Sequence, residues 1–327
     1  MKKFFATLAL LGTSIVWSSA QDSGQKSDTI PTEDEPLVTP VKPPRVVGQA
    51  QSKEEFDAWV VIDQTADLDH KAALATEFLE RFPESGLTPL AHQLLALFYQ
   101  QQDEYEKFVS HGEKAISELP SAYVLLTELA VGYAERGKVV KALAIGQKGL
   151  DGSTAAEKPG QLTLMDWTRQ KDRLKADGHY ALGLANLHQS MKAGADKPQH
   201  LNESVAHLSQ AIELEPGHER AYLRMGRAFI GLKKAEKALE AYARAVAVEG
   251  LAAQIARQQL EQLYTFVHKK KEGIDDLIVQ EKAYLAEKQA AKEAELKELQ
   301  NQEMQQFILP TEPGTPEEST PQQQTPN

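Results

Sequence analysis

The sequence contains no cysteine among its 327 residues. This absence excludes disulfide bonds, thiol nucleophiles, thiolate metal sites and a lipid-modified N-terminal cysteine. Aromatic residues are also few, at 7%, and acidic residues outnumber basic ones by 47 to 36, for a formal net charge of −11. Nucleic-acid binding needs clustered positive charge to meet the phosphates, so a nucleic-acid partner is not expected.

Long apolar runs are scarce, and the one that stands out lies at the N-terminus. Lys2 and Lys3 precede an apolar run from Phe4 to Trp17, which is followed by small residues up to Ala20. This order is typical of a secretory signal peptide, and the start looks bacterial. We therefore expect cleavage of residues 1–20 after Ala20 and a periplasmic or secreted protein. The alternative is a retained membrane anchor, although a spanning helix needs roughly 20 apolar residues.

Two further segments lack a periodic apolar face. Residues 21–51 are rich in proline, acidic and hydroxyl side chains, and residues 308–327 are rich in proline, threonine and glutamine. Such segments bury too little apolar surface to offset the entropy of ordering, so both are expected to be disordered. The first would serve as a linker and the second as a tail.

The clearest pattern in the chain is a pair of helical stripes between residues 219 and 250. The stripes comprise Tyr222, Met225, Gly226 and Phe229, followed by Ala238, Tyr242 and Ala245. Spacings of three and four residues place each set on one helix face. Gly226 and Ala238 are small, so each leaves room for another helix to approach closely.

The same pattern recurs at an interval of 34 residues. Leu95, Ala96, Tyr99 and Gly112 are followed 34 residues later by Leu129, Ala130, Tyr133 and Gly146. This unit resembles a tetratricopeptide repeat, a helical hairpin of that length. The resemblance implies an all-α superhelical solenoid, because one hairpin cannot bury its apolar face alone. It also implies a concave groove, lined by the first helix of each pair, that binds a segment of a partner protein.

The resemblance divides residues 52–271 into helix pairs. We expect pairs at about 52–85, 89–120, 123–150, 162–216 and 219–250, and a capping helix at 251–271. The pair at 162–216 carries nine extra residues, assigned to a surface loop at 191–200, which is either a binding element or tolerated extra length. Residues 274–306 predict a long charged helix, of which only the first half has an apolar face.

The sequence has no catalytic pattern. It lacks a glycine-rich phosphate loop and a Gly-x-Ser-x-Gly turn, and none of its nine histidines form a His-x-x-x-His pair. We therefore expect no enzyme activity, no cofactor and no metal. One alternative is a metal site near His200 and His207, two helical turns apart, although solvated or packing histidines are the simpler interpretation.

The aromatic residues of the repeats are expected in the core rather than in a ligand cage. They occur where the repeat needs bulk between its helices. This set comprises Tyr99, Tyr133, Tyr222, Phe229 and Tyr242.

Three arginines are candidate partner-binding residues. Arg220, Arg224 and Arg227 recur at four and three residues on the first helix of the clearest repeat. The resemblance places this helix in the groove, where the guanidinium fork matches the carboxylates of an acidic peptide. The alternative is a solvated basic face that pairs with acidic neighbours such as Glu219.

Arg220 and Arg224 also fall where the chaperone-binding clamp of this family carries basic residues. The rest of the clamp is missing: Thr127 and Val131 stand where it needs a lysine and an asparagine, and Ala181 where it needs another asparagine. A cytosolic chaperone role is therefore not expected.

These patterns together favour a non-enzymatic scaffold that binds a peptide or helical segment of a partner protein in the concave groove. The alternative is a cell-envelope assembly factor that acts by self-association or through its C-terminal helix. No membrane span is expected after signal cleavage, and the oligomeric state is left open.

Overall fold

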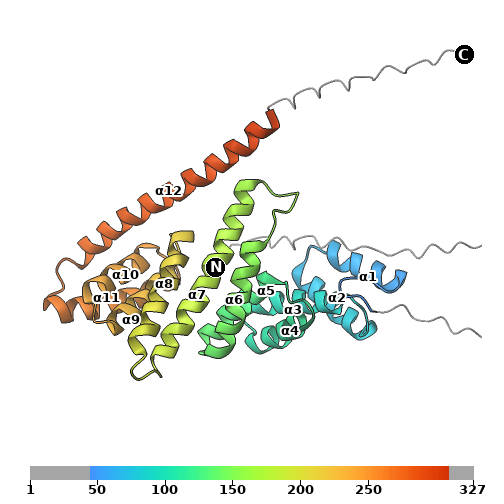
Figure 1. The fold of residues 1–327 in the computed structure, drawn as a ribbon, viewed down its shortest axis with the longest axis horizontal. Helices are drawn as coiled ribbons and strands as arrows, with labels where there is room; N and C mark the ends of the chain where they lie inside the picture. Colours follow the sequence, from blue (N-terminus) through green and yellow to red (C-terminus); the bar gives the residue numbers. More distant parts are fainter. Residues whose placement is uncertain (1–44, 309–327) are drawn as a thin grey trace, which may run out of the picture.

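The computed structural model describes residues 45–308, which form twelve α-helices and no strand within that range (Figure 1). In chain order they are α1 (Lys53–Gln64), α2 (Leu68–Arg81), α3 (Thr88–Gln101), α4 (Tyr105–Glu118), α5 (Tyr123–Glu135), α6 (Val139–Ala155), α7 (Leu164–Ser190), α8 (Lys197–Leu214), α9 (Glu219–Gly231), α10 (Ala235–Ala247), α11 (Ala253–His268) and α12 (Ile274–Ile308). The expected signal peptide, most of the linker and the tail from residue 309 lie outside the described residues. Between residues 45 and 308, no helix is both long and apolar enough to cross a membrane.

Consecutive helices pack as hairpins that follow one another along the longest axis of the molecule (Figure 1). The principal hairpins are α3–α4, α5–α6, α7–α8 and α9–α10, and each contacts the next. First helices of neighbouring hairpins also touch, α5 with α7 and α7 with α9, whereas no comparable contact joins the second helices among the described residues. The first helices therefore line the inner face of the array, and the second helices line its outer face.

Glycines set the spacing within the hairpins. A Cβ atom on Gly226 would lie 2.5 Å from the ring of Tyr242, and one on Gly183 would lie 2.8 Å from Cγ of Leu208. Tyr242 and Leu208 are completely buried. The predicted close approach at Gly226 is therefore confirmed, and Tyr242 is the side chain that uses the space.

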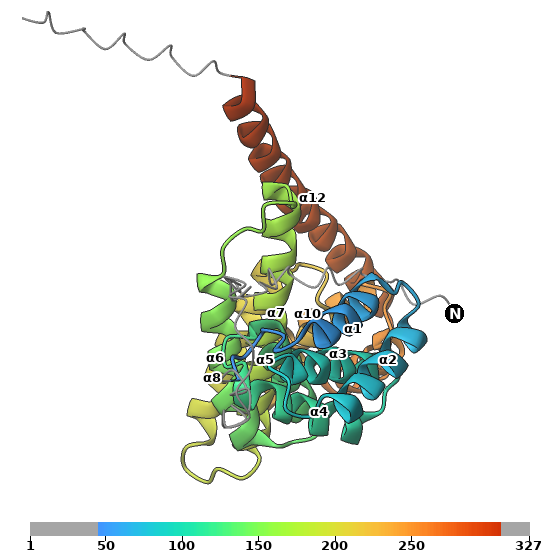
Figure 2. The ribbon, with the colours of Figure 1, turned by 90° about the vertical axis from the view of Figure 1, so that its right-hand side faces the viewer.

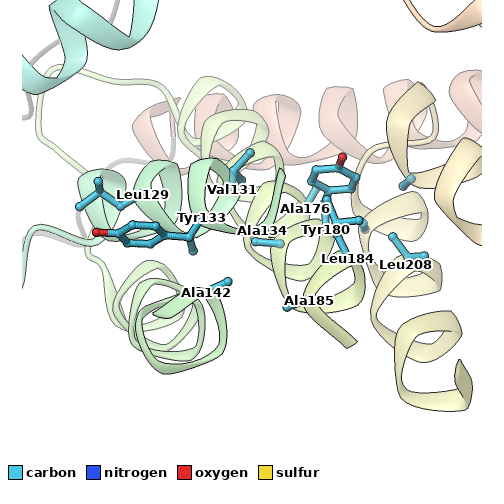
Figure 3. Close-up of a cluster of buried hydrophobic side chains, with 14 of the residues drawn as sticks. Leu129, Val131, Tyr133, Ala134, Ala142, Ala176, Tyr180, Leu184, Ala185 and Leu208 are labelled. Carbon is cyan, nitrogen blue, oxygen red and sulfur yellow. The ribbon is translucent and has the colours of Figure 1, made fainter. Parts of the chain in front are cut away.

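The core runs continuously along the array. One cluster of buried side chains extends from α3 to α10, and Figure 3 shows the part around Tyr133, Tyr180 and Leu208. A second cluster joins α9, α10, α11 and the start of α12, and a third joins α1, α2 and α3. The expected core position of the aromatic set is confirmed, since its members are either buried or partly buried against these clusters.

Residues 45–51 are packed against the array, so the expectation of disorder through residue 51 is wrong for this part. Arg45 donates from Nε to the carbonyl oxygen of Ser85 (3.1 Å) and from the guanidinium to Oγ1 of Thr88 (2.8 Å). It also forms an ion pair with Glu118 (2.5 Å). These partners lie 40 or more residues away in sequence, so the local proline-rich composition does not reveal them.

The expected loop at 191–200 is shorter in the structure. α7 ends at Ser190 and α8 begins at Lys197, so the last four residues of that segment are helical. Pro198 lies in the first turn of α8, where its fixed φ favours the helix and its missing N–H costs no hydrogen bond. The extra residues therefore lengthen a helix as well as a loop.

The long C-terminal helix folds back along the array (Figures 1 and 2). Its first half buries Ile274 and Leu285 in the cluster formed with α9, α10 and α11. Its second half meets α7: Lys292 pairs with Asp172 (2.8 Å), and Leu296 is only 4% exposed. α12 therefore bridges α10 and α7, a contact that its sequence pattern does not predict.

Substitution of Gly226 by alanine should destabilise the fold. The new methyl group would collide with the buried Tyr242 ring, and overpacking of a core typically costs about 1–3 kcal/mol. Thermal unfolding followed by circular dichroism measures the effect. The control is Gly160→Ala, where no atom lies within 4 Å of the added Cβ; equal melting temperatures for the two variants would contradict the account.

Candidate partner-binding face

The inner face carries the three arginines predicted from the sequence. All three lie on α9, which begins after His218, whose Nδ1 accepts a hydrogen bond from the backbone N–H of Ala221 (3.2 Å). This cap satisfies one of the amide groups that a helix N-terminus leaves free. α9 in turn contacts α7, so its arginines meet side chains of the neighbouring first helices.

Two of the arginines share one carboxylate. Arg224 donates to Oε2 of Glu135 on α5 (3.0 Å), and Arg220 lies 3.6 Å from Oε1 of the same residue. The hydroxyl of Tyr180 on α7 also donates to Glu135. The Glu135 side chain, at the end of α5, therefore connects α5 to both α7 and α9.

A second carboxylate extends this group. Asp177 on α7 lies 3.6 Å from Arg220 and 3.5 Å from Nε2 of His218. The guanidinium of Arg220 also lies over the ring of Tyr180, 4.7 Å from its centroid. We call this set the inner-face charge cluster. It comprises Glu135, Asp177, Tyr180, His218, Arg220 and Arg224.

The cluster keeps Arg224 charged. Burial alone would lower the pKa of Arg224, but Tyr180 and Glu135 outweigh burial and raise it. Burial and the nearby Glu135 carboxylate raise the pKa of Tyr180, so its hydroxyl stays protonated and donates. Arg220 and Arg224 thus each lie against a carboxylate, while Nε of Arg224 and Nε2 of His218 are buried without a hydrogen-bond partner in the described part of the chain.

Arg227 differs from the other two arginines. It is exposed and has no ion pair with any residue of the described range. The predicted trio is therefore not one uniform patch. The alternative interpretation of a face paired with acidic neighbours holds for Arg220 and Arg224, although their partners are Glu135 and Asp177 rather than Glu219.

The sequence interpretation missed Glu128, a half-buried carboxylate of α5 on the same face. It accepts a hydrogen bond from the side-chain amide of Gln100 on α3. Burial, and next the charge of Asp177, raise the pKa of Glu128 to about 7. Glu128 precedes Glu135 by seven residues, which is two helical turns, so both carboxylates lie on the same face of α5. This spacing is the sequence signal that could have identified Glu128.

The predicted alternative of a metal site at His200 and His207 is not supported by their placement. His200 lies 3.3 Å from Glu203, whereas His207 faces His179 on α7. No group of three or more potential ligands able to hold a metal ion occurs within residues 45–308.

Comparison with known proteins identifies the repeat. Residues 219–249 match the family model described as tetratricopeptide repeat, while no curated protein matches the chain. Among solved structures, MamA protein is 19% identical, with 64% of this chain and 96% of that chain covered and a TM-score of 0.39. PilW, a type IV pilus biogenesis factor, is 13% identical, with 69% and 99% covered and a TM-score of 0.41. The human IFIT1 dimer with PPP-AAAA is 14% identical, with 78% and 65% covered and a TM-score of 0.36.

The α9–α10 hairpin is a tetratricopeptide repeat. The hairpins α5–α6 and α7–α8 continue the array from this repeat through contacts between first helices, and α3–α4 joins them through α4 and α5. The solved structures are too distant to carry a function across. A protein–protein interaction scaffold is the role that such repeats typically have, and the architecture of this chain is of that kind.

Glu135→Gln should destabilise the protein by about 1–2 kcal/mol, because hydrogen bonds to charged groups contribute more than neutral ones. The substitution leaves Arg224, whose side chain is 22% exposed, without a charged partner. Urea unfolding at pH 7 measures the effect. Glu77→Gln is the control, because it removes an exposed pair with Arg81 that contributes about 0.5 kcal/mol or less. Equal effects of the two substitutions would contradict a structural role for the cluster.

Glu128→Gln should raise the melting temperature at pH 8. Because the folded-state pKa of Glu128 lies above its ordinary value, the folded state binds more protons between about pH 4.5 and 7. Stability from this group therefore falls as pH rises through that window and is constant above it. The advantage of the variant should grow from pH 4.5 to 7 and then level off. A pH-independent difference between variant and wild type would show that Glu128 does not titrate in this way.

Proposed function

We propose that the chain is a non-catalytic scaffold that binds a peptide or helical segment of a partner protein along its inner face. The observation that carries this proposal is the direct contact of α5, α7 and α9, which places three first helices side by side on one face. Such a surface accepts an extended or helical segment and fixes it through a few anchoring side chains.

The inner-face charge cluster supports a division of roles among the arginines. Arg220 and Arg224 are held by Glu135, so an acidic partner would have to compete with an internal carboxylate. Arg227 has no such competitor and is the arginine available to a partner. We therefore assign the contact with an acidic side chain of the partner to Arg227, and assign the shaping of the face to the other two.

The proposed site of action is the bacterial periplasm or the exterior of the cell. It rests on the leader pattern of residues 1–20, which precede the described range, and it is compatible with the absence of cysteine. Determination of the N-terminus of the protein secreted by its host tests this assignment, with cleavage after Ala20 as the expected result.

Self-association through the C-terminal helix is the alternative function, and deletion of α12 does not test it cleanly. Ile274 and Leu285 are part of a buried cluster, so a chain without α12 would expose apolar surface of α9, α10 and α11. Substitution of exposed α12 residues such as Val279, which is 68% exposed, leaves the core intact. Sedimentation of the wild type and Val279→Asp separates the two functions, since a dimer that dissociates on this change favours the alternative.

Arg227→Glu should weaken partner binding while the fold is retained. An affinity capture from the cell envelope of the native host provides the partner, and its affinity is then measured with purified protein. Reversal of an anchoring charge in an interface typically costs about 2 kcal/mol or more, which is about thirtyfold or more in affinity.

The matched control is Lys237→Glu, which makes the same change of charge on α10, the second helix of the same hairpin. Lys237 is exposed and has no ion pair among the described residues. The proposal requires the control to bind as tightly as the wild type. Equal loss in both variants would indicate a general charge effect, and no loss in either would remove Arg227 from the binding site.

A further inference from the structure

One side of α11 is exposed and uncharged. α11 is at the end of the row of hairpins (Figure 1), where repeat arrays usually carry a polar outer face. Phe266 is 73% exposed, Ile255 is 49% exposed, and Leu251, one turn before Ile255, is fully exposed. Large apolar side chains gathered on one surface indicate a contact with another molecule.

The exposed side follows a regular spacing. Its members lie four, three and four residues apart, in one line along the helix: Ile255, Gln259, Gln262 and Phe266. The same spacing marks the seam of a coiled coil. The side chains of the two glutamines form no hydrogen bond with any other residue between 45 and 308. We call these four residues the α11 stripe.

The other sides of α11 are occupied by the protein itself. Leu260 is completely buried in the cluster shared with α10. Toward α12, Arg257 pairs with Asp275 (2.9 Å). The hydroxyl of Tyr264 donates to the carbonyl oxygen of Glu272, just before α12 (3.1 Å). The α11 stripe lies on neither of these sides, so it is available to a second molecule while α11 remains fixed in the array.

The α11 stripe is symmetric about its midpoint, between residues 260 and 261. Its ends are apolar, Ile255 and Phe266, and its two middle members are glutamines. In an antiparallel pair of α11 helices, Phe266 of each chain therefore meets Ile255 of the other, while Gln259 meets Gln262. Each amide has donors and an acceptor, so the glutamines can hydrogen-bond across the pair. A two-fold axis requires this mutual complementarity between identical surfaces.

The charge distribution also suits a second copy. The chain is acidic, with a formal net charge of −11, so two copies repel wherever carboxylates are opposed. The α11 stripe carries no ionisable side chain. Of the charged residues beside it, Arg257 pairs with Glu261 (2.7 Å), and Lys269 lies over the Phe266 ring, 4.7 Å from its centroid. Two opposed stripes therefore bring no carboxylates together.

The length of the stripe limits the strength of the contact. It spans about 17 Å of helix, at a rise of about 1.5 Å per residue. Standard interfaces use about 20–30 residues and bury about 800 Å² on each side, which is more than one helix face provides. The dimer is therefore of the small class, and its dissociation constant is expected in roughly the micromolar range.

We propose that two copies of the chain associate through antiparallel packing of α11, with the α11 stripe of each copy against that of the other. The contact is separate from the proposed partner-binding face, whose residues lie on α5, α7 and α9. It is also separate from the exposed side of α12 that carries Val279. Its test therefore does not depend on the proposed function.

Sedimentation equilibrium of the purified full chain, from about 1 to 300 µM, measures the association. Phe266→Asp places a carboxylate opposite Ile255 of the other copy and should raise the dissociation constant at least about tenfold. Val140→Asp is the matched control, because Val140 is 82% exposed on α6 and the change of side chain is of the same kind. Val279→Asp tests association through α12. Both of these variants should dimerise as the wild type does.

Disulfide formation between introduced cysteines tests the antiparallel register, since the chain has no cysteine of its own. A mixture of Ile255→Cys and Phe266→Cys chains should form a covalent dimer on mild oxidation, because the two positions are opposed. The mixed dimer keeps one native contact between Phe266 and Ile255. Either variant alone should stay unlinked, because identical ends of the stripe lie about 17 Å apart along the axis, beyond the reach of a disulfide.

The proposal expects a dimer that Phe266→Asp weakens and the two controls leave unchanged, and a covalent dimer in the mixture only. A monomer at all concentrations overturns it, as does a dimer that Phe266→Asp leaves unchanged. A covalent dimer of Ile255→Cys alone would indicate a parallel pair and also overturns it. Circular dichroism checks that Phe266→Asp is folded; if it is not, the cysteine mixture decides the question.

Discussion

Close approach of helices at positions without a side chain is the constraint on which the rest of this structure depends. Gly183 and Gly226 hold the same place in two successive hairpins, and in each the opposing helix inserts a fully buried side chain, Leu208 or Tyr242, into the space. Because the hairpins then present similar surfaces, they stack in one direction and share a continuous core. The stacking alone places the first helices side by side and so forms the inner face.

The charges on that face serve first to join the hairpins. Glu135 accepts contacts from Arg220, Arg224 and Tyr180, which together come from two other helices. Charged groups removed from water are costly unless they are paired, so this cluster holds its side chains in one arrangement. A face whose side chains are already ordered loses less entropy when a partner binds. The same ordering means that only side chains outside the cluster, such as Arg227, are free to select the partner.

The helix pairs and the core could be predicted because their signals are local. Apolar stripes at spacings of three and four residues identified the α9–α10 hairpin and the close helix approach at Gly226. The 34-residue interval identified the equivalent hairpins earlier in the chain. Contacts between distant segments could not be predicted in this way: Arg45 reaches Glu118, and Arg224 reaches Glu135, over 73 and 89 residues respectively. For the same reason the sequence indicated three similar arginines, whereas their environments differ, and it did not indicate the return of α12 to α7 or the facing histidines of α7 and α8.

The central claim is that a partner segment occupies the face formed by the first helices. Site-specific photocrosslinking of the captured complex tests it most directly, with the crosslinker placed in turn at Arg173 on α7, Arg227 on α9, Lys148 on α6 and Lys237 on α10. All four positions are exposed. The account predicts crosslinks to the partner from α7 and α9 and none from α6 and α10. Crosslinks confined to the second helices would contradict it.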